Sequence, residues 1–211
     1  LTKGQYSPTS PKGFVSKSSP FGTVERPFIP AELVFGARGT FFARTLDVDM
    51  PTTVDCMVQA HKHQGASVIE CLVNCVIFNH GTHNWIADRE TRAERSILLK
   101  HGEKMIFGKD KDKGLALDYS QGLIPQLIVV SADDERVLVH DATQKDPTLH
   151  SMLAMMGAEG DTTLPIALGV IRNVEEESYD MAVNQQISQV REQSKAKCFD
   201  ELTRSLEQWE I

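Results

Sequence analysis

Cys75 is the residue of this 211-residue chain whose type and position best suit metal chemistry. It lies in the run Asn74–Asn79, directly after the apolar stretch 67–73, which has the character of a strand. Side chains at the carboxyl end of such a strand face a ligand crevice, and a thiolate there can bind iron. The alternative is a buried, inert cysteine. Spacing alone favours that alternative, because a cluster needs four thiolates and the chain has no CxxC pair.

Four histidines within a short stretch raise the question of a zinc site: His61, His63, His80 and His83. The first two are two residues apart at the predicted end of a helix, where their side chains point in different directions. We therefore expect no dedicated zinc site. The sequence also has no glycine-rich phosphate loop, no Ser/His/Asp arrangement and no aromatic-basic stripe for nucleic acid.

The opening segment is basic, whereas the rest of the chain is acidic. Residues 1–44 carry six basic and two acidic side chains, a balance of +4, which leaves −11 for the remainder of a chain whose total is −7. Either this segment meets an anion or it is a solvated loop, and composition does not separate the two.

Bulk properties favour a soluble, cytoplasmic protein. No apolar run approaches the ~20 residues that cross a bilayer, and no cleavable leader opens the chain. Four cysteines without disulfide-scaffold density fit a reducing compartment. Because the chain starts at Leu1 and its first twenty-nine residues have loop character, we expect it to be a piece of a longer protein.

The elements before Cys75 predict an α/β layer. Pro30 to Gly36 has the features of a helix start, and residues 40–44 form a short aromatic strand. A helical pattern begins at Pro51 and stops at Gly65. The nearly continuous apolar run 67–73 is typical of a parallel strand covered on both faces.

The elements after Cys75 are shorter. We expect a helix at 89–95, strands at 97–100, 104–107, 115–117, 126–130, 137–140 and 163–171, and a helix from Pro147 to Met156 with Asp146 as its N-cap. The tail from Ser178 to Ile211 is helix-forming, with an apolar stripe that lapses across 191–197. That stripe packs either on its own domain or on a neighbour.

Two motifs carry a resemblance to a known family. Residues 1–10 (LTKGQYSPTS) and residues 63–70 (HQGASVIE) running into 74–79 (NCVIFN) resemble the β subunits of 2-oxoacid:ferredoxin oxidoreductases, specifically the 2-oxoglutarate branch. Their order and their roughly seventy-residue gap also match. Weaker similarity continues through Asp146-Pro147, so the resemblance covers about residues 1–156.

The resemblance implies a fold and a division of the chain. Residues 1–80 would be the C-terminal part of a thiamine-diphosphate-binding parallel-sheet domain of α/β class. Residues 81–211 would be an α+β extension ending in a helix. The chain would correspond to the last two thirds of a β subunit, and an α subunit and the upstream part of the β subunit would be its partners.

The resemblance also implies cofactors: thiamine diphosphate, Mg²⁺ and one 4Fe-4S cluster. Cys75 matches the fourth cluster ligand; the other three, and the segment that holds Mg²⁺, would lie before Leu1. Thr2 would bind the cofactor diphosphate through its hydroxyl, and Leu1 would line the thiazolium and substrate pocket. Lys3 would pair with the remote carboxylate of 2-oxoglutarate, unless it is an ordinary surface lysine. His63 is a further candidate for tuning the cluster through its polarity.

The activity implied is oxidative decarboxylation of 2-oxoglutarate to succinyl-CoA and CO₂, with electrons passing through the cluster to ferredoxin. Coenzyme A would accept the succinyl group. The isolated chain is expected to be inactive, and no nucleic-acid or membrane partner is expected. Two alternatives stay open: an enzyme for pyruvate or another 2-oxoacid, and a non-catalytic fragment that only binds a partner.

Overall fold

A computed structural model of the chain describes residues 3–120, 122–157, 163–194 and 198–204. The chain divides into a main unit, Leu1–Glu175, and a C-terminal unit, Glu176–Ile211. Leu1 and Thr2, two of the residues predicted to line the site, lie outside the described residues.

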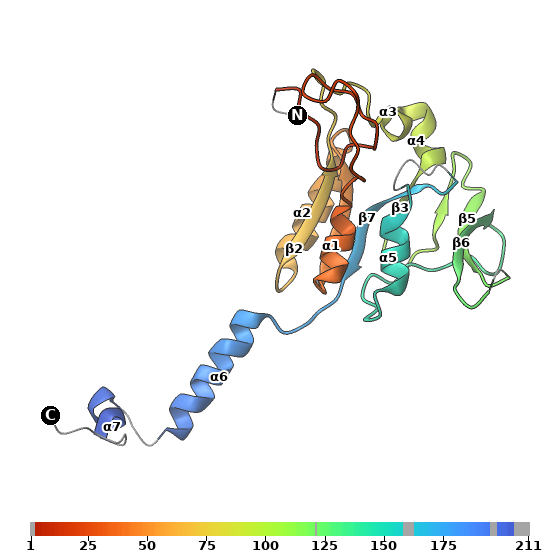
Figure 1. The fold of residues 1–211 in the computed structure, drawn as a ribbon. Helices are drawn as coiled ribbons and strands as arrows, with labels where there is room; N and C mark the ends of the chain where they lie inside the picture. The colour runs from red at the N-terminus through yellow and green to blue at the C-terminus, as the bar shows by residue number, and fades with distance from the viewer. Residues whose placement is uncertain (1–2, 121, 158–162, 195–197, 205–211) are drawn as a thin grey trace. The chain divides into compact units, whose positions relative to one another are not determined.

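A four-stranded sheet forms the centre of the main unit (Figure 1). Its strands are β1 (Phe41–Leu46), β2 (Ser67–Leu72), β3 (Ser96–Leu99) and β7 (Ile166–Asn173), in the order β2-β1-β7-β3. β2 runs parallel to β1 and β3 runs parallel to β7, whereas β7 runs antiparallel to β1. The α/β class is confirmed, and the sheet is mixed rather than purely parallel.

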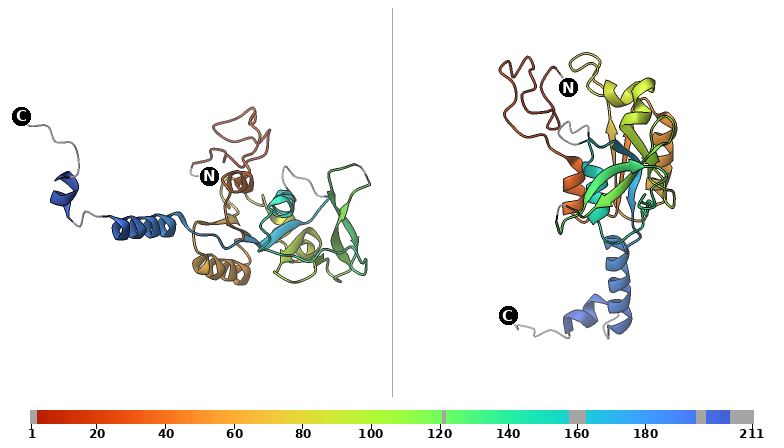
Figure 2. Two further views of the ribbon diagram at one scale, coloured as in Figure 1. Left: turned by 90° about the horizontal axis from the view of Figure 1, so that it is seen from below. Right: turned by 90° about the vertical axis from the view of Figure 1, so that its right-hand side faces the viewer.

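Helices cover both faces of this sheet (Figures 1 and 2). All six residues of β1 are buried, and they alternate between the two faces. Phe42 packs in one core with α1 (Pro30–Gly36) and α5 (Thr148–Met155), while Phe41 packs in another core with α2 (Met50–Lys62). The predicted helices at 30–36 and from Pro51 are therefore confirmed.

A second, antiparallel sheet extends the first core. It consists of β4 (Ile106–Phe107), β5 (Lys113–Asp118) and β6 (Gln126–Ser131), in that order. Leu115 of β5 and Phe107 of β4 pack in the same core as Phe42. Two short helices, α3 (Asn84–Ala87) and α4 (Arg89–Arg95), lie between β2 and β3 in the chain. Strands from both sides of residue 80 thus share one sheet, and the expected functional boundary there stays a prediction.

Three local predictions differ from the structure. β2 was expected to be covered on both faces, but it is the edge strand, and Val68 and Cys71 are exposed. The segment 137–140 is not a strand; it forms only an isolated bridge between Val139 and Lys104, because its N–H and C=O groups bond to three separate segments. Pro147 rather than Asp146 holds the N-cap of α5, although the Asp146 carboxylate accepts the Thr148 N–H at 2.8 Å.

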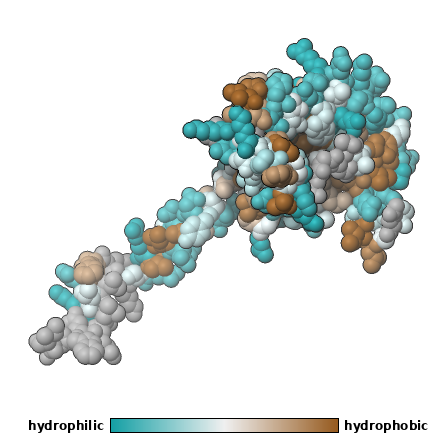
Figure 3. All heavy atoms as spheres, turned by 45° about the horizontal axis from the view of Figure 1, so that its top comes forward, coloured by the Kyte–Doolittle hydropathy of each residue, from teal (hydrophilic) through white to brown (hydrophobic). Residues whose placement is uncertain are grey.

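The two ends of the chain have different character. Residues 3–29 form a loop with an isolated bridge between Ser16 and Ser19, as expected. In the C-terminal unit, α6 (Tyr179–Gln193) has no buried residue, and its exposed apolar side chains are visible in Figure 3. The helix α7 (Phe199–Arg204) follows it. Leu206 and Trp209 of the predicted stripe lie outside the described residues. None of the helices in the described ranges is long and apolar enough to cross a membrane.

Candidate cofactor and substrate site

The loop that carries Cys75 is fixed at both of its ends. Asp47, just after β1, accepts the backbone N–H of Asn74 at 2.9 Å. The side-chain oxygen of Asn74 accepts the N–H of Gly81 at 3.0 Å, and the N–H of Asn79 donates to the carbonyl of Cys75 at 3.0 Å. These bonds close residues 74–81 into a compact turn beyond the carboxyl ends of β1 and β2, so the position of the Cys75 thiol is set by the sheet.

Backbone N–H groups of its own loop influence the thiol of the half-buried residue Cys75. The backbone N–H of Phe78, and less strongly that of Ile77, lower the pKa of the Cys75 thiol, while partial burial acts in the opposite direction. N–H groups directed at a sulfur favour its thiolate form, which is the form that binds metals and attacks electrophiles. The site can therefore supply one thiolate ligand.

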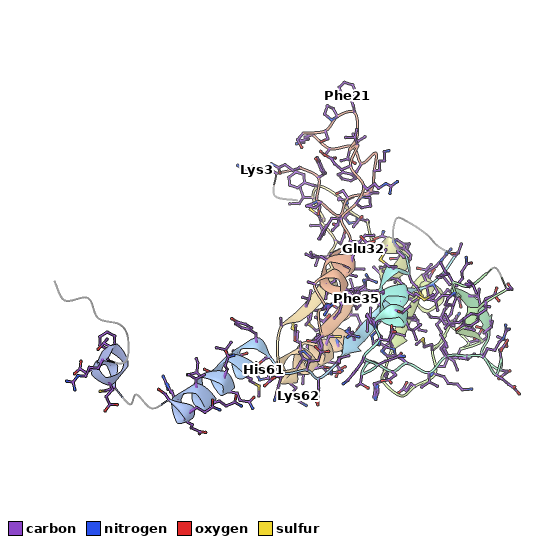
Figure 4. All side chains as sticks on the ribbon, turned by 60° about the horizontal axis from the view of Figure 1, so that its bottom comes forward. Lys3, Phe21, Glu32, Phe35, His61 and Lys62 are labelled. Atoms are coloured by element: carbon purple, nitrogen blue, oxygen red, sulfur yellow. The ribbon has the colours of Figure 1, made fainter. Side chains whose placement is uncertain are left out.

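The segment that carries Lys3 lies against the Cys75 loop. Gly4 is buried with φ of +90°, and a Cβ atom placed on it would come within 3.2 Å of Cδ1 of Phe78. Lys3 is exposed, and its backbone N–H donates to the side chain of Gln5 at 2.8 Å. The structure thus brings the two sequence motifs together across more than seventy positions. Figure 4 shows Lys3 on the N-terminal loop.

A cavity of about 530 Å³ opens beside this loop. Apolar residues from the N-terminal segment, the end of β2 and α3 form much of its wall, among them Phe28, Leu72 and Trp85. Its polar members include Arg44 and Glu70, which face each other across β1 and β2. A second cavity, of about 670 Å³, lies between α2 and β3–β7, and neither motif contributes to it.

Arg44 and Glu70 form a buried ion pair that sequence reasoning missed. Nε of Arg44 lies 2.6 Å from Oε2 of Glu70, and Nη2 donates to the carbonyl of Ala154 at 2.8 Å. The guanidinium carbon also lies 5.8 Å from the centre of the Phe42 ring. The sequence could have indicated this pair, because Arg44 ends a predicted strand that is otherwise mostly aromatic and apolar. A charge buried in such a strand needs a partner.

His83 is a second missed residue of the cavity wall. It is about half-buried, and that burial lowers the pKa of its imidazole, while the carboxylates of Asp47 and Glu70 act in the opposite direction. A neutral imidazole at the edge of this cavity can donate or accept a hydrogen bond.

The other histidines do not form a metal site. Within the described ranges, no three His, Cys, Asp or Glu side chains come together in a way that could hold a metal ion. His63 bonds to Thr40 and Asn173, each at 2.9 Å, at the start of β1. Cys75 follows the far end of the neighbouring strand, and six residues of strand span about 20 Å. The structure therefore places His63 and Cys75 at opposite ends of neighbouring strands, and the suggested tuning role of His63 stays a prediction.

A separate buried polar network holds the loop before α5. Arg172 of β7 donates to Nδ1 of His150 at 3.0 Å and to the carbonyl of Gln144 at 3.0 Å. Nε2 of His150 then donates to the carbonyl of Asp141 at 2.8 Å. Because arginine has no acceptor, these bonds fix His150 as the neutral tautomer with its proton on Nε2. Burial lowers the pKa of His150 most, and the charge of Arg172 lowers it further, while the hydrogen bond to the Asp141 carbonyl and the nearby carboxylates act in the opposite direction.

Comparison with known proteins places these motifs in context. No family model matches the chain. It is 35% identical over 197 residues to the 2-oxoglutarate oxidoreductase subunit KorB of Mycobacterium tuberculosis, a match that covers 90% of this chain and 50% of that subunit. It is 37% identical over 101 residues to the 2-oxoglutarate synthase subunit KorB of Archaeoglobus fulgidus, covering 48% of this chain and 33% of the relative.

The chain is similar in sequence to part of these KorB subunits.

Part of a solved structure has a fold similar to that of this chain. The 2-oxoglutarate:ferredoxin oxidoreductase from Magnetococcus marinus, with 2-oxoglutarate, coenzyme A and succinyl-CoA bound, matches with a TM-score of 0.61 and 14% identity, over 98% of this chain and 54% of that chain. At that identity the likeness is one of fold. The chain spans about half the length of the Mycobacterium subunit. The resemblance found in the sequence motifs is confirmed.

Proposed function

We propose that this chain is a segment of the β subunit of a 2-oxoglutarate:ferredoxin oxidoreductase. That enzyme would convert 2-oxoglutarate and coenzyme A to succinyl-CoA and CO₂ and pass the electrons to ferredoxin. The observation that carries the proposal is the 35% identity to a KorB subunit over 197 residues. The contact between Gly4 and Phe78 supports it, because it joins the two motifs on which the family resemblance rests.

The residues around Cys75 fit one ligand position of an iron–sulfur cluster. The sulfur is half-buried, its loop is closed by hydrogen bonds, and two backbone N–H groups favour its thiolate. Cys75 would hold one iron atom of a 4Fe-4S cluster, and the other three thiolates would come from outside this chain. The same N–H groups would raise the reduction potential by stabilising negative charge on the cluster sulfurs.

Lys3 is proposed to bind the substrate. Its ammonium would pair with the carboxylate remote from the reacting carbon and so favour 2-oxoglutarate over monocarboxylate acids. Thr2 is proposed to bind the diphosphate of thiamine diphosphate, and Leu1 is proposed to line the thiazolium and substrate pocket. Thiamine diphosphate, when bound, supplies the nucleophilic carbon and the electron sink for the decarboxylation. The role of this chain would then be to position the substrate and one iron atom of the cluster.

The enzyme would work as a heteromer in the cytoplasm. An α subunit and the rest of the β subunit would complete the site, and the chain alone would be inactive. Unpaired backbone groups of the edge strand β2, together with exposed Val68 and nearby Val73, support coverage by another segment or subunit.

A second candidate function is the same reaction on a different 2-oxoacid. Relatives named 2-oxoacid:ferredoxin oxidoreductase subunit beta, from Saccharolobus solfataricus among others, are 34% identical to this chain over 79 residues. The names of these relatives do not specify the acid, so the relatives fit either specificity.

A substrate panel assayed on the complete complex tests the proposal. Reduction of ferredoxin would be followed with 2-oxoglutarate, pyruvate and a branched-chain 2-oxoacid, each with and without coenzyme A. The proposal requires the highest kcat/KM for 2-oxoglutarate and dependence on coenzyme A. A complex that prefers pyruvate would support the second candidate, and one that is inert toward every acid would refute both.

A further inference from the structure

Phe78 contacts both parts of the candidate site. Its backbone belongs to the closed loop 74–81, three residues after Cys75, and its N–H is the largest influence that lowers the pKa of the Cys75 thiol. Its ring lies against Gly4, where the position of a Cβ atom would be 3.2 Å from Cδ1 and 3.4 Å from Cε1. One residue therefore links the cysteine to the segment that carries Lys3.

Gly4 has the conformation and the size that this contact requires. Its φ of +90° is one that side chains of L residues rarely adopt. A Cβ there would also press on the ring, because 3.2 Å is shorter than ordinary carbon–carbon contact. Gly4 is buried although Lys3, its neighbour, is exposed. The glycine is thus the point at which the N-terminal segment is held against the loop.

The contact between Phe78 and Gly4 fixes the position of the Lys3 backbone, from which the Lys3 side chain extends. Lys3 is joined directly to Gly4, and the bond from its N–H to Gln5 closes the turn around that glycine. The stem of Lys17 also lies near Gly4, with its Cδ 3.8 Å from the same Cβ position. The glycine next to Lys3 is therefore packed close to both a ring and a lysine stem.

We propose that Phe78 is a positioning residue that keeps the Lys3 segment and the Cys75 loop at one fixed separation. The inference rests on the proposed function, in which Lys3 binds the remote carboxylate of the substrate and Cys75 holds the cluster. Without the ring, the segment loses its contact with the Cys75 loop and the ammonium is no longer held at the carboxylate. The loop around the sulfur also relaxes, which weakens the N–H bond to the cluster ligand.

The test uses the complete complex with Phe78→Ala in the β subunit. We expect KM for 2-oxoglutarate to rise by about tenfold, the factor that corresponds to one modest lost interaction, while KM for coenzyme A stays unchanged. We also expect the reduction potential of the cluster to fall and its paramagnetic resonance spectrum to change. Phe78→Tyr keeps the ring and should restore both properties.

Phe35→Ala is the matched control. Phe35 is a partly buried phenylalanine on α1 that packs on Phe42, with ring centres 5.7 Å apart. Figure 4 labels it on its helix, apart from Lys3 on the loop. Its loss should lower stability without altering KM for 2-oxoglutarate or the cluster spectrum. A general loss of packing would instead change both variants alike, which would overturn the positioning role.

Two milder substitutions test the positioning role of Phe78 if the complex with Phe78→Ala does not assemble. Phe78→Leu replaces the ring with a smaller side chain and so weakens the contact with Gly4. Gly4→Ala adds a Cβ atom that presses on the ring. Both variants should raise KM for 2-oxoglutarate. Wild-type values of KM and potential in the variants would refute the inference while leaving the proposed function intact. An inactive wild-type complex would refute the proposed function instead.

Discussion

Arg44 and Glu70 lie directly opposite each other on β1 and β2, and Nε of Arg44 is 2.6 Å from Oε2 of Glu70. Their side chains are only 5% and 14% exposed. The pair ties the edge strand to the central strand and forms part of the wall of the cavity beside Cys75. A charge at this depth depends on its partner, because removal of one member leaves the other buried and uncompensated.

Glu70→Gln should therefore destabilise the protein. The guanidinium of Arg44 would keep the carbonyl of Ala154 but lose its counter-charge. We expect the free energy of unfolding to fall by about 3 kcal/mol, measured by urea denaturation. Glu94→Gln removes the partner of Lys113 on the surface and serves as the control, with almost no change expected. Equal effects of the two substitutions would contradict the assigned role of the buried pair.

Acidification should weaken the fold through His150 and His140. Burial is the largest cause that lowers the pKa of both imidazoles. The folded chain then binds fewer protons than the unfolded chain below about pH 6.5, so stability is full above that pH and is lost as the pH falls toward the lowered pKa values. Between about pH 7.5 and 5.5 we expect a loss of about 1 kcal/mol.

Thermal denaturation across this pH range measures that loss. His150→Gln keeps an acceptor and a donor near Arg172 but does not titrate, so its stability should vary less with pH. His61→Gln, at an exposed position on α2, should retain the wild-type dependence. A pH dependence that His150→Gln leaves intact would exclude His150 as its source.

Thiol reactivity should distinguish Cys75 from Cys56 in the metal-free protein. The N–H of Phe78 lowers the pKa of Cys75, whereas burial raises the pKa of Cys56 to about 11. The thiolate is the reactive form. Iodoacetamide at neutral pH should therefore label Cys75 well before Cys56, as followed by mass spectrometry of the cysteine peptides. Faster labelling of Cys56 would contradict the structure around both sulfurs.

Lys3 should control which 2-oxoacid the complete complex prefers. Lys3→Ala removes the ammonium proposed to bind the remote carboxylate, a group that pyruvate lacks. The ratio of kcat/KM for 2-oxoglutarate to that for pyruvate should fall by at least about tenfold. Lys12→Ala, on the same exposed loop, should leave the ratio unchanged. An unchanged ratio in Lys3→Ala would remove this residue from the substrate site.

Periodicity and caps were sufficient to predict the elements around the site. The apolar spacing and Pro51 predicted α2, and the aromatic run at 40–44 predicted β1, because these signals are local. The edge position of β2 could not be predicted, since the same apolar run suits a strand covered by its own chain or by another. The antiparallel entry of β7 beside β1 depends on contacts more than one hundred residues apart.

The site residues also fall into two groups: those that a local motif indicates, and those that meet only in the folded chain. The motifs indicated Lys3 and Cys75, but nothing in the sequence placed the Phe78 ring on Gly4. The Arg44–Glu70 pair was missed because it depends on the register between two strands. Arg172 and His150 were missed because they meet only after β7 and α5 have packed.

The measurement that tests the account most directly is the iron content of Cys75→Ala in the complete β subunit, with Cys71→Ala as its matched control. Cys71 is an exposed cysteine four positions earlier, at the end of β2, and no ligand role is assigned to it. Iron and acid-labile sulfide per subunit would be determined together with the visible absorbance and the redox spectrum. The account predicts that Cys75→Ala loses or damages the cluster while Cys71→Ala retains it. A full iron count and a normal redox spectrum in Cys75→Ala would contradict it.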